Sequence, residues 1–230
     1  MEFANDTSCA PTQWRQWPPS HALDPAGVHL WRIDLDAFPA DPGLLSADER
    51  QRLELIVSPV QARRFIASRC ALRLLLGQIS GLPPQTLVFQ RSPEGKPRLA
   101  EPADLHFNLS HSGELVLLGI SWLAPLGLDL EPIRNRSQQL AIARRVLPPE
   151  RLEPILQAQD EKTQTQAFTA EWVRFEALQK MTGAGIFGPK HWPAHQLQAL
   201  VPQPGWLAAC AIAIAPDQAL SWHFWQADAR

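Results

Sequence analysis

Short segments with a period of two alternate with helical segments along this chain, in an order that occurs twice. Each half begins with a predicted strand, continues with helices and ends with three predicted strands. The predicted strands lie at 28–35, 87–91, 105–110 and 115–121, and, after Pro125, at 126–131, 197–201, 206–215 and 220–226. Because the element order recurs without a residue-level repeat, we expect an α+β fold of two lobes, a pseudo-duplication.

Helix signals occur in both halves. Ser46 followed by Glu49 is a capping box, which predicts the start of a helix. The segment 63–76 is a predicted helix that ends at Gly77, and further helices are predicted from about residue 137 to 182.

The length and composition suit two small globular lobes. With 230 residues, of which 45% are hydrophobic and 19% charged, the chain can bury a core, which excludes a disordered or fibrous protein. We expect the boundary near 121–125, between an N-terminal lobe of residues 1–122 and a C-terminal lobe of residues 123–230.

The cysteines and the apolar stretches indicate the cellular compartment. Cys9, Cys70 and Cys210 are far apart and form no CxxC, so they predict neither a disulfide framework nor a zinc site. Residues 1–10 lack the pattern of a secretion signal, and the longest apolar stretch, 206–215, is far shorter than the ~18 residues that span a bilayer. We therefore expect a cytoplasmic protein without a membrane partner.

Basic side chains are concentrated in one part of the chain. The net charge is -2, which argues against a general nucleic-acid binder. Between residues 50 and 98, however, there are nine basic residues and only two acidic ones, Glu54 and Glu94, which gives a local charge of +7. The basic residues are Arg50, Arg52, Arg63, Arg64, Arg69, Arg73, Arg91, Lys96 and Arg98. This cluster suits a compact polyanion such as a nucleotide, or else is a solvated arginine-rich helix face.

Two familiar patterns do not fit their usual roles. Gly183, Gly185 and Gly188 spell G-x-G-x-x-G, but they follow a helix, whereas the dinucleotide fingerprint follows a strand. His191 and His195 have the spacing of a helical metal pair, but Pro193 lies between them and predicts a loop. The chain also lacks a Walker loop, a G-x-S-x-G elbow and a kinase signature.

The segment L-G-L-D-L-E-P, residues 126–132, carries two carboxylates on one predicted strand face. The strand period places Gly127, Asp129 and Glu131 together. Carboxylates two residues apart can bind one hard divalent cation, for which oxygen ligands favour Mg²⁺. The alternative is an exposed strand edge with ordinary alternation.

A further carboxylate lies on the predicted helix 168–181. The helical wheel places Glu176 and Lys180 together between two apolar flanks, so this charge pair is expected to be partly buried. It is either a structural i, i+4 salt bridge or a metal ligand, or base, with a lysine facing an anion.

Two more segments are candidates for binding an anion. In H-F-N-L-S-H-S-G, residues 106–113, a predicted strand delivers Ser110 and His111 into a turn, which makes a plausible phosphate seat or an ordinary hairpin turn. In E-G-K-P, Lys96 lies in a turn fixed by proline, as a solvated tip or as an anion contact.

Four motifs, in this order and spacing, resemble the Sfp-type 4'-phosphopantetheinyl transferases, which move phosphopantetheine from coenzyme A to a serine of carrier proteins. The motifs are G-K-P at 95–97, F-N-L-S-H-S-G at 107–113, G-L-D-L-E at 127–131 and W-V-R-F-E-A-L-Q-K at 172–180. The resemblance extends from about Ser46 to Ala211.

The resemblance implies a fold and an activity. It implies a two-lobed 4'-phosphopantetheinyl transferase fold, each lobe a small, mainly antiparallel sheet packed with helices, with the active site at the lobe interface. The enzyme would be a monomer of the holo-[acyl-carrier-protein] synthase type that uses Mg²⁺, takes coenzyme A as co-substrate, acts on apo acyl or peptidyl carrier proteins and releases 3',5'-ADP. The alternatives are a non-catalytic relative that binds coenzyme A or a carrier protein, and a metal-dependent nucleotide pyrophosphate hydrolase.

The resemblance also implies roles for the residues of the catalytic centre. Asp129, Glu131 and Glu176 would hold Mg²⁺, and Glu176 would also be the base for the carrier serine. Lys180 would hold phosphate charge near the metal.

Five further residues would bind coenzyme A by the same resemblance. Lys96, Ser110 and His111 would seat its phosphates. Arg64 matches the arginine that the family uses for the 3'-phosphate, and Arg52 lies where the family often has another basic contact.

The last motif departs from the family pattern W-S-x-K-E-A-x-x-K. Val173 and Phe175 replace its serine and its first lysine. Phe175 cannot bind a phosphate, and on the helical wheel it joins Phe168 and Trp172, so we expect it to pack in the core.

Overall fold

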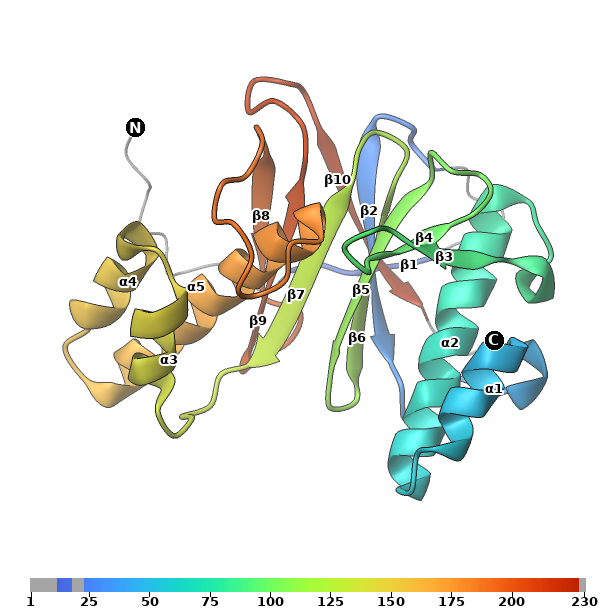
Figure 1. Cartoon of the computed structure of the whole chain (residues 1–230), viewed down its shortest axis with the longest axis horizontal. Coiled ribbons are helices and arrows are strands. Elements are labelled where there is room, and N and C mark those ends of the chain that lie inside the picture. Colours follow the sequence, from blue (N-terminus) through green and yellow to red (C-terminus); the bar gives the residue numbers. More distant parts are fainter. Residues whose placement is uncertain (1–11, 18–22, 228–230) are drawn as a thin grey trace.

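The computed structural model of the chain describes residues 12–17 and 23–227. Two lobes, each with a sheet and helices, lie side by side (Figure 1). This arrangement confirms the α+β fold of two lobes. Cys9 and the rest of the chain start, up to residue 11, lie outside the described residues.

The first lobe contains a mixed sheet of five strands. In spatial order they are β1 (Arg15–Gln16), β10 (Ser221–Ala227), β2 (Gly27–Asp34), β6 (Leu115–Ser121) and β5 (His106–Ser112). β10 is parallel to β1 and β2, whereas β2, β6 and β5 are antiparallel neighbours. The lobe boundary expected at residue 122 stays a prediction. It follows β6 directly, but β10, from the C-terminal part of the chain, returns to the first sheet.

The second lobe contains an antiparallel sheet of three strands. Their order is β7 (Leu126–Pro132), β9 (Trp206–Ile212) and β8 (Gln196–Leu200). A separate hairpin pairs β3 (Phe89–Arg91) with β4 (Pro97–Leu99). The predicted strands are thus confirmed to within a few residues. β1 and β4 are additional strands, each too short to show a period.

Two helices precede the β3–β4 hairpin, α1 (Ala47–Glu54) and α2 (Pro59–Ser80), and short 3-10 turns lie at Pro42–Leu44 and Pro84–Thr86. The predicted capping box at the start of α1 is confirmed, with both of its hydrogen bonds present. The predicted helix end at Gly77 is wrong. Gly77 is buried inside α2, where an added Cβ would lie 2.9 Å from the carbonyl oxygen of Leu82, and the helix ends at Gly81 with φ 74°.

Three helices follow β7: α3 (Gln139–Val146), α4 (Pro149–Leu156) and α5 (Glu161–Thr182). A capping box of Asp160 and Thr163 begins α5, and Gly183 ends it in the left-handed conformation. Gly183 is thus a helix C-cap, which agrees with the prediction that these glycines follow a helix. His191 and His195 lie in a loop, as predicted.

Gly127 allows α5 to pack directly on β7. A Cβ at this position would lie 2.0 Å from the carbonyl oxygen of Ala177 and 2.1 Å from the backbone nitrogen of Met181. Any larger residue would push the helix away from the strand. This contact sets how close the α5 side chains come to the carboxylates of β7.

Apolar side chains join the two lobes. One face of the five-stranded sheet packs under α2, and the other face places Leu30 and Leu117 against Leu128 and Ile212 of the second sheet. Cys70 and Cys210 are buried free thiols, so no disulfide links them. Among the described residues, no helix is long and apolar enough to span a membrane.

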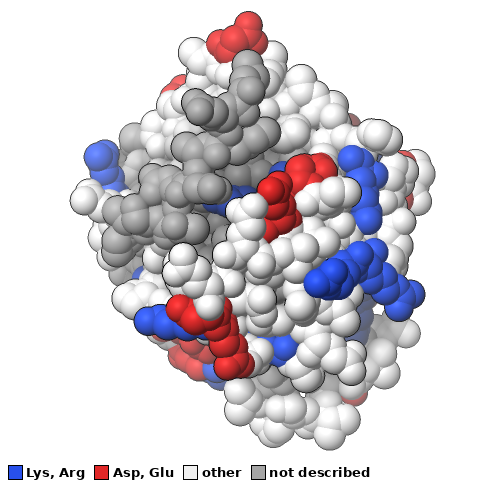
Figure 2. Space-filling view, turned by 90° about the vertical axis from the view of Figure 1, so that its left-hand side faces the viewer, with Lys and Arg blue, Asp and Glu red and all other residues white. Residues whose placement is uncertain are grey.

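The face of the molecule that carries α3 and α4 has mixed charge. Lysine and arginine side chains form separate groups there, with aspartate and glutamate side chains between them (Figure 2). The described residues of this face therefore present no continuous basic stripe.

Phe175 lies in the core, as the helical wheel predicts. Its side chain is fully buried in a cluster with Phe168 and Trp172, and the indole of Trp192 packs edge-on at 6.2 Å between ring centroids. Val173, the other departure from the family pattern, is also buried and packs against the second sheet. Both residues are therefore apolar parts of the core.

We predict that Phe175→Ala lowers the free energy of unfolding by about 3 to 5 kcal/mol, because it empties a buried aromatic position. Chemical denaturation measures the change. Phe187→Ala is the control, since Phe187 is 78% exposed, and its effect should stay within about 0.5 kcal/mol. Similar effects for both variants would contradict the assignment of Phe175 to the core.

Asp24 connects the turn before β2 to β10. Its Oδ2 accepts a hydrogen bond from Ser221 Oγ at 2.6 Å and lies 3.2 Å from His223 Nε2, while its Oδ1 accepts from the amide of Ala26. The Ser221 hydroxyl, then the Ala26 amide and the His223 ring, lower the pKa of the Asp24 carboxyl to about 2. The carboxylate thus helps to fix the crossing strand.

We predict that Asp24→Asn lowers the melting temperature near neutral pH and that the difference from wild type shrinks between pH 4 and pH 2. The folded-state pKa lies below the ordinary 3.8, so the carboxylate stabilises the fold above that value and loses its effect as it becomes protonated. Thermal melts across this range measure the difference, with Asp104→Asn as an exposed control. A difference that is independent of pH would contradict the role of the charge.

Candidate active site

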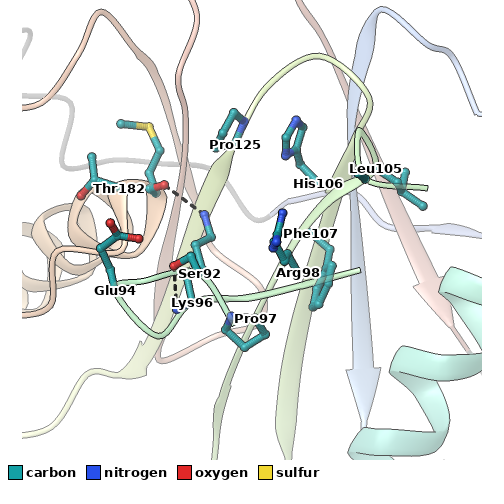
Figure 3. Close-up of a pocket in the computed structure, with 12 residues that line it drawn as sticks. Ser92, Glu94, Lys96, Pro97, Arg98, Leu105, His106, Phe107, Pro125 and Thr182 are labelled. Atoms are coloured by element: carbon teal, nitrogen blue, oxygen red, sulfur yellow. Dashed lines mark hydrogen bonds between the residues drawn. The ribbon is translucent and has the colours of Figure 1, made fainter. Parts of the chain in front are cut away.

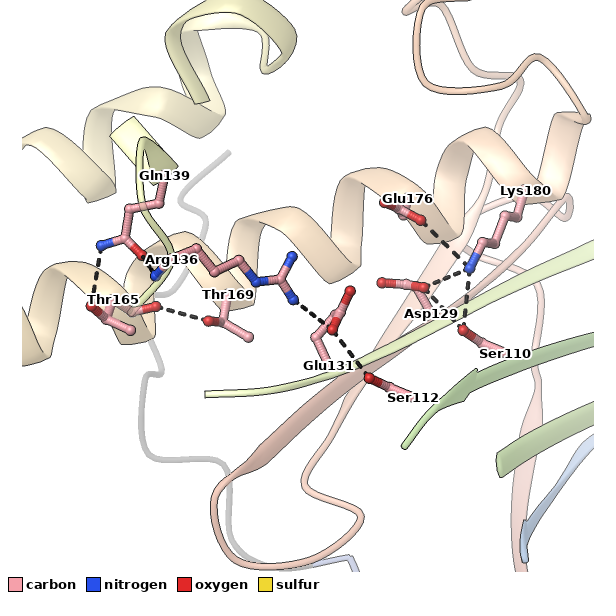
Figure 4. A network of polar contacts seen from close by, with 10 residues as sticks. All are labelled: Ser110, Ser112, Asp129, Glu131, Arg136, Gln139, Thr165, Thr169, Glu176 and Lys180. Carbon is pink, nitrogen blue, oxygen red and sulfur yellow. Dashed lines mark hydrogen bonds and ion pairs between the residues drawn. The ribbon is translucent and has the colours of Figure 1, made fainter. Parts of the chain in front are cut away.

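The candidate site lies where β5 and β7 run side by side. The amide of Leu128 donates to Asn108 Oδ1 at 2.8 Å, which ties the two strands together in register. Two residues further along β5, Ser110 faces Asp129, and Ser112 faces Glu131 (Figure 4). The strand period therefore places two hydroxyls opposite two carboxylates.

Asp129 is the buried centre of this site. It is 3% exposed, and its Oδ1 accepts hydrogen bonds from Lys180 Nζ at 2.5 Å and from Ser110 Oγ at 3.0 Å. Its Oδ2 is buried without a hydrogen-bond partner among the described residues. Burial raises the pKa of Asp129 to about 7 against the opposing charge of Lys180. A buried carboxylate with a free oxygen is suited to receive a cation.

Lys180 lies between two carboxylates. Besides Asp129, its ammonium group lies 3.5 Å from Glu176 Oε2, and it donates to Ser110 Oγ at 3.2 Å (Figure 4). The predicted pairing of Glu176 with Lys180 on one side of the helix is present. In this structure the ammonium group of Lys180 occupies the space between Asp129 and Glu176. The carboxylate oxygens of these two residues are donors of the kind that a hard divalent cation prefers.

Glu131 lies on the same strand face as Asp129 and is paired with an arginine. Its Oε2 lies 2.5 Å from a guanidinium nitrogen of Arg136 and 3.4 Å from Ser112 Oγ. Within the described part of the chain, no three His, Cys, Asp or Glu side chains are grouped closely enough to hold a metal ion. The structure thus brings two of the three predicted carboxylates together. Sequence reasoning missed Arg136, which no pattern marks as a partner of Glu131.

Lys96 reaches into the structure from the β3–β4 hairpin. Its Nζ donates to the carbonyl oxygens of Leu126 at 2.7 Å and Met181 at 3.0 Å. Burial lowers the pKa of the Lys96 amine to about 8. Lys96 therefore links the hairpin to the start of β7 and the end of α5, next to Lys180.

A pocket of about 260 Å³ lies beside Lys96 (Figure 3). Its lining residues come from the hairpin, from the first residues of β5 and from the end of α5; they include Lys96, Pro97, Arg98, His106, Phe107 and Thr182. Both charge signs are present in its lining, since Glu94 lies there with Lys96 and Arg98, and the rest of the lining is mainly apolar. The pocket adjoins Met181 and Thr182, the two residues that follow Lys180.

The other predicted residues for coenzyme A lie on the first lobe. Arg64 makes a two-pronged ion pair with Asp36, at 2.7 and 2.6 Å, and lies 3.9 Å from Glu114. Arg52 is exposed on α1. His111 lies at the solvent-exposed end of β5. The surrounding protein removes water from its ring and so lowers its pKa, and the positive charges of Arg69 and Lys180 lower the pKa further.

We predict that Lys96→Met lowers the free energy of unfolding by about 2 kcal/mol or more. The variant leaves two buried carbonyl oxygens without their donor, and each such group costs about 1–3 kcal/mol. Denaturation by urea measures the loss, and the exposed neighbour Arg98→Met is the control. Equal stabilities of the Lys96 variant and wild type would show that the two hydrogen bonds contribute nothing.

The fold and the site together define the class of protein: a two-lobed α+β protein with a buried carboxylate and lysine centre where the two lobes meet. Residues 29–122 match the family described as 4'-phosphopantetheinyl transferase, N-terminal, and residues 125–228 match the 4'-phosphopantetheinyl transferase superfamily.

Individual relatives have the same assignment. The chain is 34% identical to the 4'-phosphopantetheinyl transferase HetI of Nostoc sp., over 92% of this chain and 98% of the relative. It is 31% identical to the 4'-phosphopantetheinyl transferase Sfp of Bacillus subtilis, over 63% of this chain and 68% of the relative. The 4'-phosphopantetheinyl transferase AcpT of Salmonella typhimurium is 34% identical, over 62% of this chain and 71% of the relative.

The chain therefore belongs to the 4'-phosphopantetheinyl transferase family and is an enzyme of the phosphopantetheinyl transferase type. The resemblance stated from the four sequence motifs is confirmed. Members of this family use coenzyme A as substrate and generally a divalent metal.

Proposed function

We propose that this enzyme moves 4'-phosphopantetheine from coenzyme A to a serine of an apo acyl or peptidyl carrier protein at the Asp129 centre, with Mg²⁺ and with release of 3',5'-ADP. The observation that carries the proposal is the free buried oxygen of Asp129 beside a positive charge that Asp129 and Glu176 share. A monomer in the cytoplasm is part of the same proposal.

Asp129 and Glu176 would hold the metal ion in this proposal. Bound there, Mg²⁺ would neutralise the negative charge of the pyrophosphate. Glu131 belongs to the proposed set because it follows Asp129 by two residues on the same strand face. To join the set, it would have to leave its ion pair with Arg136.

The side chains of the site would then serve the transfer as follows. The carrier serine oxygen forms a bond to the phosphorus atom that bears the pantetheine arm, and the bond from that phosphorus to the oxygen of 3',5'-ADP breaks. Glu176 takes the proton of the serine hydroxyl as it attacks. Lys180, next to both carboxylates and Ser110, balances the charge of the leaving group.

Coenzyme A would extend from this centre across β5. Ser110 faces the centre and is proposed to contact the pyrophosphate, and His111 follows on the exposed end of the strand. Lys96 would help by fixing the end of α5 beside the pocket. Arg64 has an internal carboxylate partner, whereas Arg52 is exposed on α1, where it would contact an anion of coenzyme A.

The departure at Phe175 leaves these groups in place. Phe175 is buried in its own apolar cluster, and the side chains that surround Asp129 come from other positions. This arrangement favours a catalytic enzyme over a relative that only binds.

Mass spectrometry of an apo carrier protein tests the proposal. After incubation with the enzyme, coenzyme A and Mg²⁺, the carrier should gain one phosphopantetheine group. Free cleavage products of coenzyme A with an unmodified carrier would instead identify a pyrophosphate hydrolase. Binding without any change would identify a non-catalytic relative.

We predict that Asp129→Asn lowers the rate of transfer by roughly a hundredfold or more, because the variant keeps the shape of the side chain but loses the charge that holds the cation. The rate with saturating coenzyme A and Mg²⁺ measures the effect, and Asp217→Asn on an exposed turn is the control. An unchanged rate of the variant with Mg²⁺ in excess would contradict the role of Asp129 in the catalytic centre.

A further inference from the structure

Arg136 and Glu131 form an ion pair next to the Asp129 centre. A guanidinium nitrogen of Arg136 lies 2.5 Å from Glu131 Oε2, and the two side chains are 24% and 20% exposed. Ser112 Oγ donates to the same carboxylate oxygen at 3.4 Å (Figure 4). The pair is therefore partly shielded from solvent, which makes the attraction between its charges stronger than in an ordinary surface ion pair.

The backbone of Arg136 is fixed to α5 through Gln139. The Gln139 amide donates to the Arg136 carbonyl oxygen at 3.1 Å, and the Arg136 amide donates to Gln139 Oε1 at 3.4 Å. Gln139 is buried, and its Nε2 donates to Thr165 Oγ1 at 3.1 Å. Gln138 has a φ of 66°, a conformation that a non-glycine residue keeps where surrounding contacts impose it. The Arg136 side chain can therefore leave Glu131 while its main chain stays in place.

Internal cations already pair with the three carboxylates of the proposed metal site. Lys180 lies 2.5 Å from Asp129 and 3.5 Å from Glu176, and Arg136 pairs with Glu131. A divalent cation that binds these carboxylates brings two more positive charges into the same space. Because like charges at short distance repel each other, the entry of the metal ion favours the departure of an internal cation.

Arg136 is the internal cation that can leave more easily. Lys180 is held by hydrogen bonds to Asp129 and Ser110 and also lies beside Glu176 (Figure 4). Among the residues that the structure describes, the guanidinium of Arg136 is held by Glu131 alone. Its side chain also borders solvent, so water can hydrate the guanidinium as soon as it leaves the carboxylate.

We propose that Arg136 is a positioning residue that competes with the divalent cation for Glu131. The inference rests on the proposed function, in which Asp129, Glu131 and Glu176 hold that cation. The free buried Oδ2 of Asp129 is the observation that favours a cation there. While Glu131 is paired with Arg136, its carboxylate is not available as a ligand. The ion pair opens when the metal ion binds, so Arg136 sets the concentration of metal that the enzyme needs.

Metal binding in the absence of coenzyme A tests this competition without any transfer. Mn²⁺ is the probe, because carboxylate oxygens bind it as they bind Mg²⁺ and electron paramagnetic resonance measures the free ion. We expect Arg136→Gln to lower the Kd for Mn²⁺ by about threefold or more, since the metal ion no longer displaces a cation. Arg134→Gln, at an exposed arginine of the same segment, is the charge-matched control and should change the Kd by less than about twofold.

The direction of the change separates competition from a structural role. Damage to the site would raise the Kd for Mn²⁺, whereas the loss of a competitor lowers it. An unchanged or higher Kd for Arg136→Gln, or an equal decrease in Arg134→Gln, would overturn the proposal. If Arg136→Gln does not fold, Arg136→Lys decides, because lysine keeps the charge but lacks the planar guanidinium and pairs less well with a carboxylate. Its Kd should then be lower than that of wild type, and an unchanged Kd would overturn the proposal.

Thermal melts show whether the ion pair opens when the metal ion binds. With a chelator present, Arg136→Gln should melt at a lower temperature than wild type, because the variant lacks the ion pair with Glu131. With saturating Mg²⁺ the pair is already open in wild type, so the difference in melting temperature should become smaller. A difference of the same size in both conditions would mean that Arg136 stays on Glu131, which would overturn the proposal.

These measurements keep the inference separate from the proposed function. An enzyme whose Kd for Mn²⁺ depends on Arg136 but that modifies no carrier protein supports the inference and overturns the proposed transfer. An enzyme that modifies carrier proteins, with the same Kd in wild type and in Arg136→Gln, keeps the proposed function and overturns the inference. A wild type that binds neither Mn²⁺ nor Mg²⁺ overturns the inference together with the proposed metal site.

Discussion

The approach of α5 to β7 at Gly127 is the contact on which the site depends. Because no Cβ separates the strand from Ala177 and Met181, the helix lies close enough for Lys180 to reach Asp129 from one turn beyond Glu176. A larger residue in place of Gly127 would move α5 away from β7, and Asp129 would then lose its ion pair with Lys180. The glycine in G-L-D-L-E is therefore as much a part of the centre as its carboxylates.

The remaining contacts keep that geometry in place from both lobes. Lys96 holds the hairpin of the first lobe to the backbone of β7 and α5, and Asn108 fixes β5 against β7. Below them, the apolar side chains of the two sheets interlock. A site assembled at such a junction requires both lobes, since each supplies residues that the other cannot replace.

The sequence predicts the local features well. The capping box at Ser46, the strand face with Asp129 and the burial of Phe175 follow from short periods and nearby partners, so they can be read from neighbouring residues. The helix end at Gly77 is wrong because burial, which depends on the fold, overrides the usual preference of glycine.

Features that depend on distant contacts could not be predicted. The pairing of Glu131 with Arg136 and the burial of the Lys96 amine require positions in space that no spacing in the sequence encodes. Arg69 belongs to the same group. In the sequence it is one of nine basic residues, and only the fold shows that its Nε is buried without a hydrogen-bond partner among the described residues.

The place of β10 has a consequence for how the protein is made. The position between β1 and β2 is filled by residues that the ribosome adds after every other element described here. Until then, β2 has an open edge in a nascent chain whose other strands are already synthesised. Until β10 has been made, this edge of β2 either stays unpaired or is shielded by another protein. The last strand to be made thus closes the first sheet.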